Sequence, residues 1–395
     1  MPSTDARTAP HTARERRWGL IAAITSVTVF GLSIGQGAPL LSLLLEQRGT
    51  DPTLNGLNAG VTFIGVLLGP LLAPHWVRWA GIRNLLLTCY CLDIATFLAM
   101  KAFDGFGAWL VLRVALGLSG SSIFTCSEAW INLLAGDVGR GRIIGIYAAA
   151  LSAGFGTGPL LLSITGIQGW APFIGNAVLT ALAMLPLLGV GDATLSLARE
   201  RGASPLRMFA RAPSILLVVV VFGLYESTLM TLLPIWGVRI GLGDRLAAAT
   251  LSAVYLGAIL LQMLIGWLSD LWSRTAALGL CAVVGLIGAL VLAGMTPSTP
   301  VLFCLLFVWG GVASGIYPVA LSMAGDRFQG TDLVAVNAAL IIAYGLGALA
   351  GPALGGIAID VSDPQGLLWM FVLLFVGLLA VTRLTANQPP RRGTG

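Results

Sequence analysis

The chain has 395 residues, of which 57% are hydrophobic and 10% are charged, whereas soluble domains carry about 25% charged residues. With a mean hydropathy of +0.90, it holds more apolar surface than a soluble fold can bury, which excludes the soluble classes and makes lipid the expected solvent. The net charge of +5 does not indicate a nucleic-acid partner, because the basic residues lie at the ends of apolar runs, as membrane topology requires.

The first residues, 1–17, are polar and basic and are expected to form a disordered tail. The apolar run at 18–45 is longer than a signal-peptide core and lacks a small-residue cleavage site, so it predicts an uncleaved first membrane helix. Eleven further runs each come close to the roughly 20 residues that cross a bilayer. They cover about 54–77, 84–103, 107–134, 143–166, 170–190, 214–238, 246–268, 275–296, 301–324, 333–358 and 366–383. The predicted fold class is an all-α polytopic membrane protein with 12 transmembrane helices.

The distribution of basic residues predicts that both termini face the cytoplasm. With an inner N-terminus, 17 of the 22 basic residues fall in tails and inner segments, and one, Arg113, lies inside a span. The four in outer loops are Arg48, Lys101, Arg239 and Arg245. An excess of basic residues on one side is the usual mark of the cytoplasmic face.

The two halves of the chain resemble each other. "GFGTGP" ends at Pro159 and "GALAGP" ends at Pro352, an offset of 193 residues, and "FGL" at Phe30 recurs 192 residues later at Phe222. Such offsets indicate a duplication into two parallel six-helix repeats, between which substrate binds in transporters of that build. The expected parts are a cytoplasmic tail at 1–17, a bundle at 18–190, a cytoplasmic linker at 191–213, a second bundle at 214–383 and a cytoplasmic tail at 384–395.

From about 18 to 383 the chain resembles the major facilitator superfamily. "GWLSDLWSR" is similar to that family's signature between the second and third helices of each half, with Asp270 and Arg274 in the matching positions. In the first half, Arg78 stands where the Asp would be. "LVLRVALGLSG", which carries Arg113, resembles the fourth-helix signature. The resemblance implies the major facilitator fold, alternating access and a place in the bacterial inner (plasma) membrane.

"GIYAAALSAGFGTGP" places Gly154, Gly158 and Pro159 at the spacing of the family's antiporter signature, although Leu162 and Ser163 replace the glycine pair that should close it. "SEAWIN" and "YPVALSMAGDRF" are similar to the YcaD-like branch of the family. The resemblance therefore implies an antiporter whose substrate the branch does not define.

These motifs also have a physical interpretation of their own. Glycines four residues apart let helix backbones approach closely, and a proline after glycine removes a backbone hydrogen bond. The pattern predicts either a gating interface or ordinary tight packing. The candidate residues are Gly154, Gly158, Pro159, Gly347, Gly351 and Pro352. Asp270 and Arg274 lie at a predicted helix end, where they form either a cytoplasmic latch or a turn with solvated charges.

Charged residues well inside spans are the main candidates for coupling protons or contacting substrate, and there are four: Asp93, Arg113, Glu128 and Glu226. Each costs at least roughly 2.5–3.5 kcal/mol at a lipid-exposed helix centre, so each is expected to face a wet cavity or a partner. Desolvation favours the neutral form of a carboxyl group and a nearby cation favours its charged form. A carboxyl group between these two influences can take up a proton on one side and release it on the other.

Each of these residues also has a structural alternative. Glu226 is either the coupling residue or a buried acid bonded to another helix or to a neighbour, namely Tyr225, Ser227 or Thr228. Asp93 and Arg113 lie on neighbouring helices and are candidates for an ion pair. Glu128 lies near the inner end of its span, where an acid can reach water at the interface.

Five polar residues within spans are expected to line the substrate path or, alternatively, to join helices by hydrogen bonds. They are Gln36, Tyr225, Tyr317, Asn337 and Tyr344. The 5 cysteines and 2 histidines lack the spacing of metal ligands. No metal and no cofactor is therefore expected.

Together these features predict a secondary active transporter that moves a small organic molecule by alternating access, as a monomer in the lipid bilayer. The first hypothesis is proton-coupled antiport for efflux, and the alternative is a proton-coupled symporter for uptake. A membrane enzyme is disfavoured because no zinc motif or nucleophile–base set lies within a span, and no Walker sequence is present. A non-transporting sensor is disfavoured because it should carry a further soluble domain.

Overall fold

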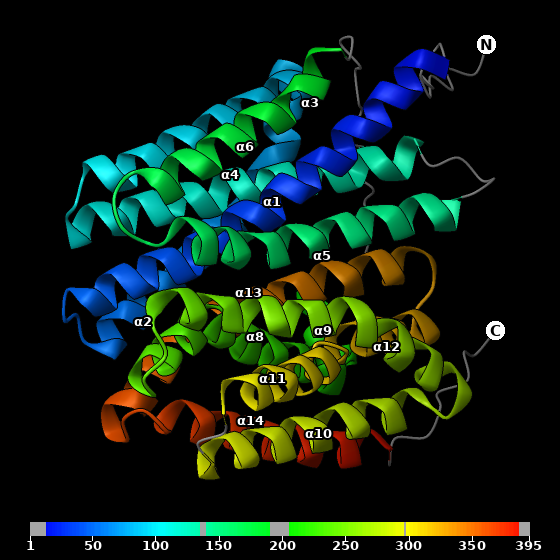
Figure 1. Ribbon diagram of the computed structural model, residues 1–395. Helices are drawn as coiled ribbons and strands as arrows, with labels where there is room; N and C mark the ends of the chain where they lie inside the picture. Colours follow the sequence, from blue (N-terminus) through cyan, green and yellow to red (C-terminus); the bar gives the residue numbers. More distant parts are fainter. Residues whose placement is uncertain (1–12, 135–139, 190–204, 296–297, 387–395) are drawn as a thin grey trace. The chain divides into compact units, whose positions relative to one another are not determined.

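The computed structural model describes residues 13–134, 140–189, 205–295 and 298–386, and within these ranges the chain forms helices and no strand (Figure 1). The helices are α1 (Ala13–Gln47), α2 (Pro52–Gly60), α3 (Thr62–Ala102), α4 (Phe106–Leu134), α5 (Arg140–Thr165), α6 (Ala171–Leu188), α7 (Pro205–Arg211), α8 (Pro213–Arg239), α9 (Asp244–Leu271), α10 (Arg274–Gly294), α11 (Thr299–Ala313), α12 (Ile316–Arg327), α13 (Gly330–Val361) and α14 (Gly366–Ala386). Parts of the predicted tails, 1–17 and 384–395, and of the predicted linker, 191–213, lie outside the described residues.

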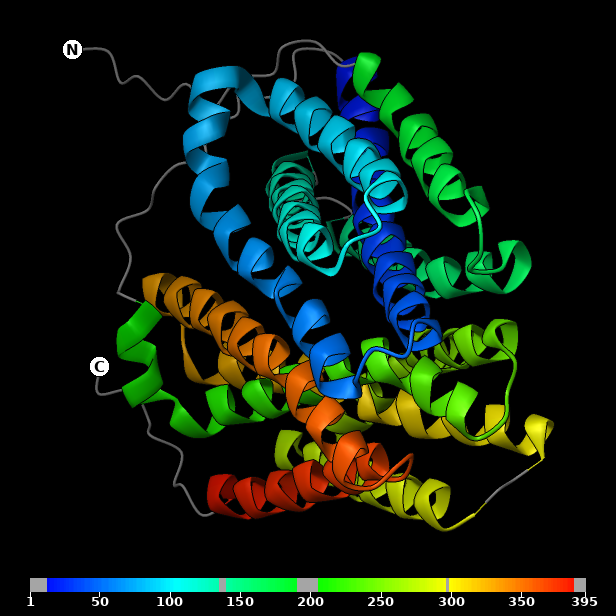
Figure 2. The same cartoon turned by 90° about the vertical axis from the view of Figure 1, so that its left-hand side faces the viewer.

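Eleven stretches of the described chain are long and apolar enough to cross a membrane. One of them, Pro52–Ala102, has 51 residues, more than twice the roughly 20 that one crossing needs. Its helix α3 breaks at Gly81, whose φ of 79° and ψ of 159° suit glycine because a side chain would clash there. Figure 2 shows the two straight parts of α3 meeting at a sharp bend. Counted as two crossings, this stretch confirms the twelve predicted membrane helices.

The outer faces of the helices carry large apolar side chains. On α10, for example, Val283, Ile287 and Leu290 are exposed. Their spacing of four and three residues places them on one face of the helix. An exposed apolar stripe of this kind is unfavourable in water and is what lipid-facing helices present.

The contacts within the chain define two compact units. Unit 1 consists of Met1–Leu40 and Val61–Arg199, and unit 2 of Leu41–Gly60 and Glu200–Gly395. The segment Leu41–Gly60, which the sequence places between the first two spans, thus packs with helices from the second half of the chain. The predicted bundles at 18–190 and 214–383 follow the sequence repeat, whereas the two units are defined by contacts between residues. The bundle boundaries stay a prediction.

The duplication is visible in how glycines pack inside each unit. In unit 1, α1 and α5 cross so closely that a Cβ added at Gly154 would lie 3.0 Å from the amide nitrogen of Leu32. In unit 2, α8 and α13 cross in the same way, and a Cβ added at Gly347 would lie 2.8 Å from the amide nitrogen of Leu224. Leu224 follows Leu32 by 192 residues and Gly347 follows Gly154 by 193, the offsets found in the sequence.

The predicted linker is partly helical, because α7 lies within its last residues. The Arg211 side chain at the end of α7 forms an ion pair with Asp332 on α13 at 2.8 Å. Its guanidinium also lies 5.5 Å from the centre of the Phe328 ring. The end of the linker is thus held against unit 2 rather than being an irregular loop throughout.

Candidate functional site

Asp93 is fully buried in unit 1, on the second straight part of α3. Its Oδ2 accepts hydrogen bonds from Ser33 Oγ on α1, at 2.8 Å, and from Thr180 Oγ1 on α6, at 3.4 Å. Its Oδ1 is buried and has no hydrogen-bond partner. Oδ1 therefore has no hydrogen bond that would stabilise a negative charge on it.

The hydrogen bonds continue from Asp93 across α6 and back to α1. The single hydroxyl hydrogen of Thr180 is shared between Asp93 Oδ2 and Asn176 Oδ1, which lies 3.3 Å from Thr180 Oγ1. Asn176 Nδ2 donates to Gln36 Oε1 at 3.0 Å. Gln36 Nε2 in turn donates to the Pro172 carbonyl oxygen at 2.6 Å. Gln36 is fully buried, so in this structure it joins α1 to α6. Its predicted place on the substrate path stays a prediction.

Arg113 on α4 is 2% exposed, and its Nε and Nη2 have no hydrogen-bond partner. The expected ion pair with Asp93 is absent among the ion pairs of the described residues. The physical reason is that hydroxyl groups from α1 and α6 already hold the Asp93 carboxyl group. A buried guanidinium with unsatisfied donors is costly, and the predicted role of Arg113 in coupling or substrate binding stays a prediction.

Glu128, also on α4, is exposed. This is the placement that the interfacial alternative requires, because an acid near the end of a span can reach water. Its predicted role in coupling stays a prediction.

Glu226 on α8 is half-buried and receives a hydrogen bond from the Tyr344 hydroxyl on α13. Of the neighbours that the sequence offers as partners, Ser227 donates instead to the Gly223 carbonyl at 2.7 Å. The buried hydroxyl of Tyr225 has no hydrogen-bond partner. The partner of Glu226 thus comes from another helix of unit 2, as one of the alternatives expects.

Aromatic side chains surround this position. Phe222, one turn before Glu226 on α8, contacts Tyr317 on α12 and Tyr344 on α13, with ring centroids 5.7 Å and 6.2 Å away. Tyr317 and Tyr344 lie 6.3 Å from each other. We call Phe222, Tyr317 and Tyr344 the ring triad. The triad brings two of the predicted path residues to the predicted coupling acid.

The remaining predicted path residues differ in their surroundings. Tyr225 is 2% exposed and packs on Trp309, Phe371 and Phe375 at 5.2–5.8 Å between ring centroids, so it belongs to the core of unit 2. Asn337 is half-buried, and its Oδ1 has no hydrogen-bond partner. It precedes Tyr344 by seven residues, or about two turns, and thus shares a face of α13 with it.

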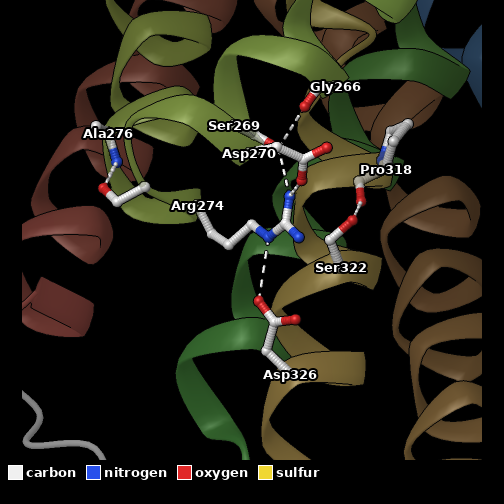
Figure 3. Close-up of polar contacts among 9 residues, drawn as sticks. Gly266, Ser269, Asp270, Arg274, Ala276, Pro318, Ser322 and Asp326 are labelled. Atoms are coloured by element: carbon white, nitrogen blue, oxygen red, sulfur yellow. Dashed lines mark hydrogen bonds and ion pairs between the residues drawn. The ribbon is translucent and has the colours of Figure 1, made fainter.

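Arg274 connects three helices at one end of unit 2 (Figure 3). It forms ion pairs with Asp270 at the end of α9 and with Asp326 at the end of α12, the latter at 3.1 Å. It also donates to Ser269 Oγ at 2.7 Å. The predicted pair of Asp270 and Arg274 is therefore formed, and Asp326 is a partner that the sequence analysis missed. Whether the cluster acts as a latch stays a prediction.

The other predicted gating residues lie within the helix crossings already described. A Cβ added at Gly158 would lie 2.6 Å from the Gly35 carbonyl carbon on α1, and one added at Gly351 would lie 2.5 Å from the Leu224 carbonyl oxygen on α8. Pro159 and Pro352 lie inside α5 and α13. These contacts agree with tight packing, and gating by the same residues stays a prediction.

The segment Leu41–Gly60 is held to the rest of unit 2 by polar contacts. Arg239 at the end of α8 forms ion pairs with Glu46 on α1, at 2.7 Å, and with Asp363, at 2.8 Å. Thr53 on α2 donates to Asp360 on α13 through its backbone N–H at 3.1 Å. The sequence analysis counted Arg239 only as an outer basic residue, because nothing in the sequence pairs it with a residue almost 200 positions away.

We expect Glu46→Gln to lower the free energy of unfolding by roughly 1.5–3 kcal/mol, the range for hydrogen bonds to charged groups. The reason is that the side chains of Glu46 and Arg239 are only 14% and 21% exposed. Asp326→Asn is the matched control, since Asp326 is 59% exposed and exposed pairs contribute at most about 1 kcal/mol. Unfolding of the purified protein in mixed detergent micelles measures both. Equal losses of unfolding free energy in the two variants would contradict the expectation that the ion pair of Glu46 and Arg239 stabilises the protein more than an exposed pair does.

Metal chemistry gains no support from the described part of the chain. No group of three or more His, Cys, Asp or Glu side chains gathers there as a metal site would require. The cysteines there are free, three buried and two exposed.

The family model described as Major Facilitator Superfamily matches residues 20–254 and 215–395. The chain belongs to this superfamily. Among curated relatives, it is 25% identical over 365 residues to the uncharacterized MFS-type transporter YfkF of Bacillus subtilis (strain 168), covering 90% of this chain and 93% of that one. It is 26% identical over 375 residues to an uncharacterized MFS-type transporter of Yersinia pseudotuberculosis (strain YPIII), covering 93% and 96%.

Solved structures of the superfamily share the fold. A mutant of the nucleoside transporter NupG matches with a TM-score of 0.80 at 13% identity, covering 93% of this chain and 99% of that one. A D-xylose-proton symporter matches with a TM-score of 0.75 at 15% identity, covering 94% and 97%. Identities this low indicate the fold alone. The family match and the curated relatives make this chain a membrane transporter of the superfamily, whose members move small molecules and are not enzymes.

Proposed function

We propose that the protein is a proton-coupled antiporter that exports a small organic molecule, and that it belongs to the YcaD-like branch of the superfamily. One observation carries the proposal: each unit places one carboxyl group that is not exposed, Asp93 or Glu226, well inside a membrane-spanning helix without a cationic partner. Among the residues that the structure describes, no ion pair includes Asp93 or Glu226. Hydroxyl groups hold them instead. A carboxyl group in such surroundings gains or loses a proton when its access to water changes.

In this proposal Glu226 binds the proton or the substrate, and the two compete for it. Asp93 is the second protonation site. Arg113 supplies a positive charge that stabilises an ionised Asp93 or an anionic group of the substrate. Protonation shifts the protein towards one access state and substrate shifts it towards the other. Differential affinity of each ligand for the two states is what drives the cycle.

The remaining roles complete the proposal. The antiporter-like motif with Gly154, Gly158 and Pro159 is the reason for preferring antiport to symport. The Arg274 cluster acts as a latch on the cytoplasmic side. The protein works as a monomer in the bacterial inner membrane. Both of its termini lie in the cytoplasm, because most basic residues fall on one side of the predicted spans and that side is usually cytoplasmic.

The sign of a pH change separates antiport from symport. Compounds that raise the thermal midpoint of the purified protein are added outside proteoliposomes that contain a pH-sensitive dye. An antiporter that moves the compound into the liposome moves protons out of it, so the internal pH is expected to rise. A fall in internal pH would establish symport in place of the proposed antiport, and no change with a transported compound would refute proton coupling. Protein-free liposomes treated with the same compounds provide the baseline.

A further inference from the structure

The three rings of the triad come from three helices and meet beside one carboxylate. Phe222 and Glu226 are separated by one turn of α8, so they point to the same side of that helix. Tyr344 contributes both a ring to the triad and the hydroxyl that donates to Glu226. A negative charge and several aromatic faces are thus placed together in unit 2.

Glu226 keeps some accessible surface at a point where its own face of α8 is otherwise buried. Phe222, Leu229, Met230 and Leu233 share this face of α8, and their exposures are 5%, 1%, 4% and 0%. Glu226 itself is only half-buried, as are Tyr317 and Tyr344. On this side of α8, the accessible surface is therefore confined to the carboxyl group and two of the rings.

The charge of Glu226 is left for a ligand to neutralise. Three of the arginines of unit 2 are committed to other acids: Arg211 to Asp332, Arg239 to Glu46 and Arg274 to Asp326. No ion pair among the described residues includes Glu226. An anionic ligand would be repelled at this position, whereas a cation would be attracted.

Aromatic rings favour the same sign of charge. The face of an aromatic ring carries partial negative charge and attracts a cation within about 6 Å of the ring centroid. A carboxylate beside such rings offers a compact charge on one side and polarisable apolar faces on the others. Organic cations, whose charge is spread over an apolar body, fit this combination better than hydrated inorganic cations do.

We propose that the ligand of this protein is an organic cation whose charged group binds between Glu226 and the ring triad. The proposal rests on the proposed function in one respect, because it assigns the transported molecule to the carboxylate that also exchanges protons. It names a class of substrate that neither the relatives nor the solved structures assign to this chain.

The test is binding of tetraphenylphosphonium to the purified protein by equilibrium dialysis in detergent, with no proton gradient. Tetraphenylborate has nearly the same shape and the opposite charge, so it controls for apolar partitioning. We expect the phosphonium to bind at least about 10-fold more tightly than the borate, and Glu226→Gln to remove that preference. Equal binding of the two ions by the unaltered protein, or an unchanged preference in the variant, would overturn the proposal.

A second pair of variants separates ring chemistry from a loss of folding. Tyr317→Leu removes the ring and is expected to weaken phosphonium binding by about 2- to 30-fold. Tyr317→Phe keeps the ring and is expected to bind the phosphonium more tightly than Tyr317→Leu does. Each variant must elute as the unaltered protein does in size exclusion. Identical weakening by both substitutions would mean that the ring face does not contact the cation.

Failure of this proposal and failure of the proposed antiport are distinguishable. Charge-selective binding without any proton movement in proteoliposomes would leave the cation site standing and refute proton coupling. Proton movement driven by a neutral or anionic compound, with no preference for the phosphonium over the borate, would refute the cation site and leave coupling intact.

Discussion

Glu226→Gln is expected to reduce substrate-driven proton movement to the level of protein-free liposomes. Glutamine has nearly the same shape as glutamate and can still accept a hydrogen bond from Tyr344, but it cannot take up or release a proton. The packing around the site should therefore be kept while the coupling is lost. The measurement is the change in internal pH of proteoliposomes after substrate is added, together with uptake of labelled substrate down its own gradient.

Tyr344→Phe is the matched control for this experiment. It removes the hydrogen bond to Glu226 but keeps both the carboxyl group and the ring, so proton movement should continue at a reduced rate. Asp93→Asn tests the other buried acid in the same assay. If Glu226→Gln kept full proton movement while Asp93→Asn lost it, the coupling role assigned to Glu226 would be wrong and would pass to unit 1.

Gly347→Ala is expected to lower the free energy of unfolding by about 3 kcal/mol, at the upper end of the range for overpacking. The added Cβ would lie against the Val220 carbonyl oxygen and 2.8 Å from the Leu224 amide nitrogen. Backbone atoms of α8 cannot rotate away as a side chain can, so α8 and α13 would have to separate. Such a separation also displaces Tyr344, which lies on the same helix as Gly347 and contacts Glu226.

Gly377→Ala on α14 supplies the control for that substitution. Nothing lies within 4 Å of a Cβ added at Gly377, and alanine is favoured over glycine in a helix by about 1 kcal/mol. This variant should be as stable as the unaltered protein or slightly more stable in a detergent-unfolding titration. Equal stability of Gly347→Ala would show that the close approach of α8 and α13 is not required.

The duplicated scaffold carries acids that are not duplicated. Glu226 occupies the position that Ile34 holds 192 residues earlier, and Asp93 corresponds to Gly285 at the same offset. The Gly285 carbonyl oxygen accepts a hydrogen bond from Trp309 Nε1 at 2.8 Å, so unit 2 has an aromatic contact where unit 1 has a carboxyl group. The helix crossings are thus shared by the two repeats, whereas the chemistry differs between them.

Several features could be predicted from the sequence because they depend on local pattern. Apolar runs of about 20 residues define membrane spans wherever they occur, since the backbone in lipid must bond within its own helix. The glycines at 154 and 347 predicted close helix crossings because a missing side chain leaves room whatever the partner is. The acids within spans were recognisable for the same kind of reason, since a charge is costly in lipid on any helix.

Partners could not be predicted, because they depend on how distant helices pack. Asp93 was expected to meet Arg113 on the neighbouring helix, but hydroxyl groups of Ser33 and Thr180 hold it instead. Nothing in the sequence distinguishes Ser33 and Thr180 from the other Ser and Thr residues, many of which donate to a carbonyl oxygen of their own helix.

The sequence by itself determined the class of the protein, its twelve spans, its duplication and the residues whose charge needs an explanation. Only the tertiary structure decided that Glu226 meets Tyr344 and the ring triad, and that Leu41–Gly60 packs with unit 2. The physical reason is that span, charge and close packing follow from the free energy of each segment in lipid. A contact between segments depends on how two helices are rotated and at what angle they cross. One sequence pattern is compatible with many such arrangements.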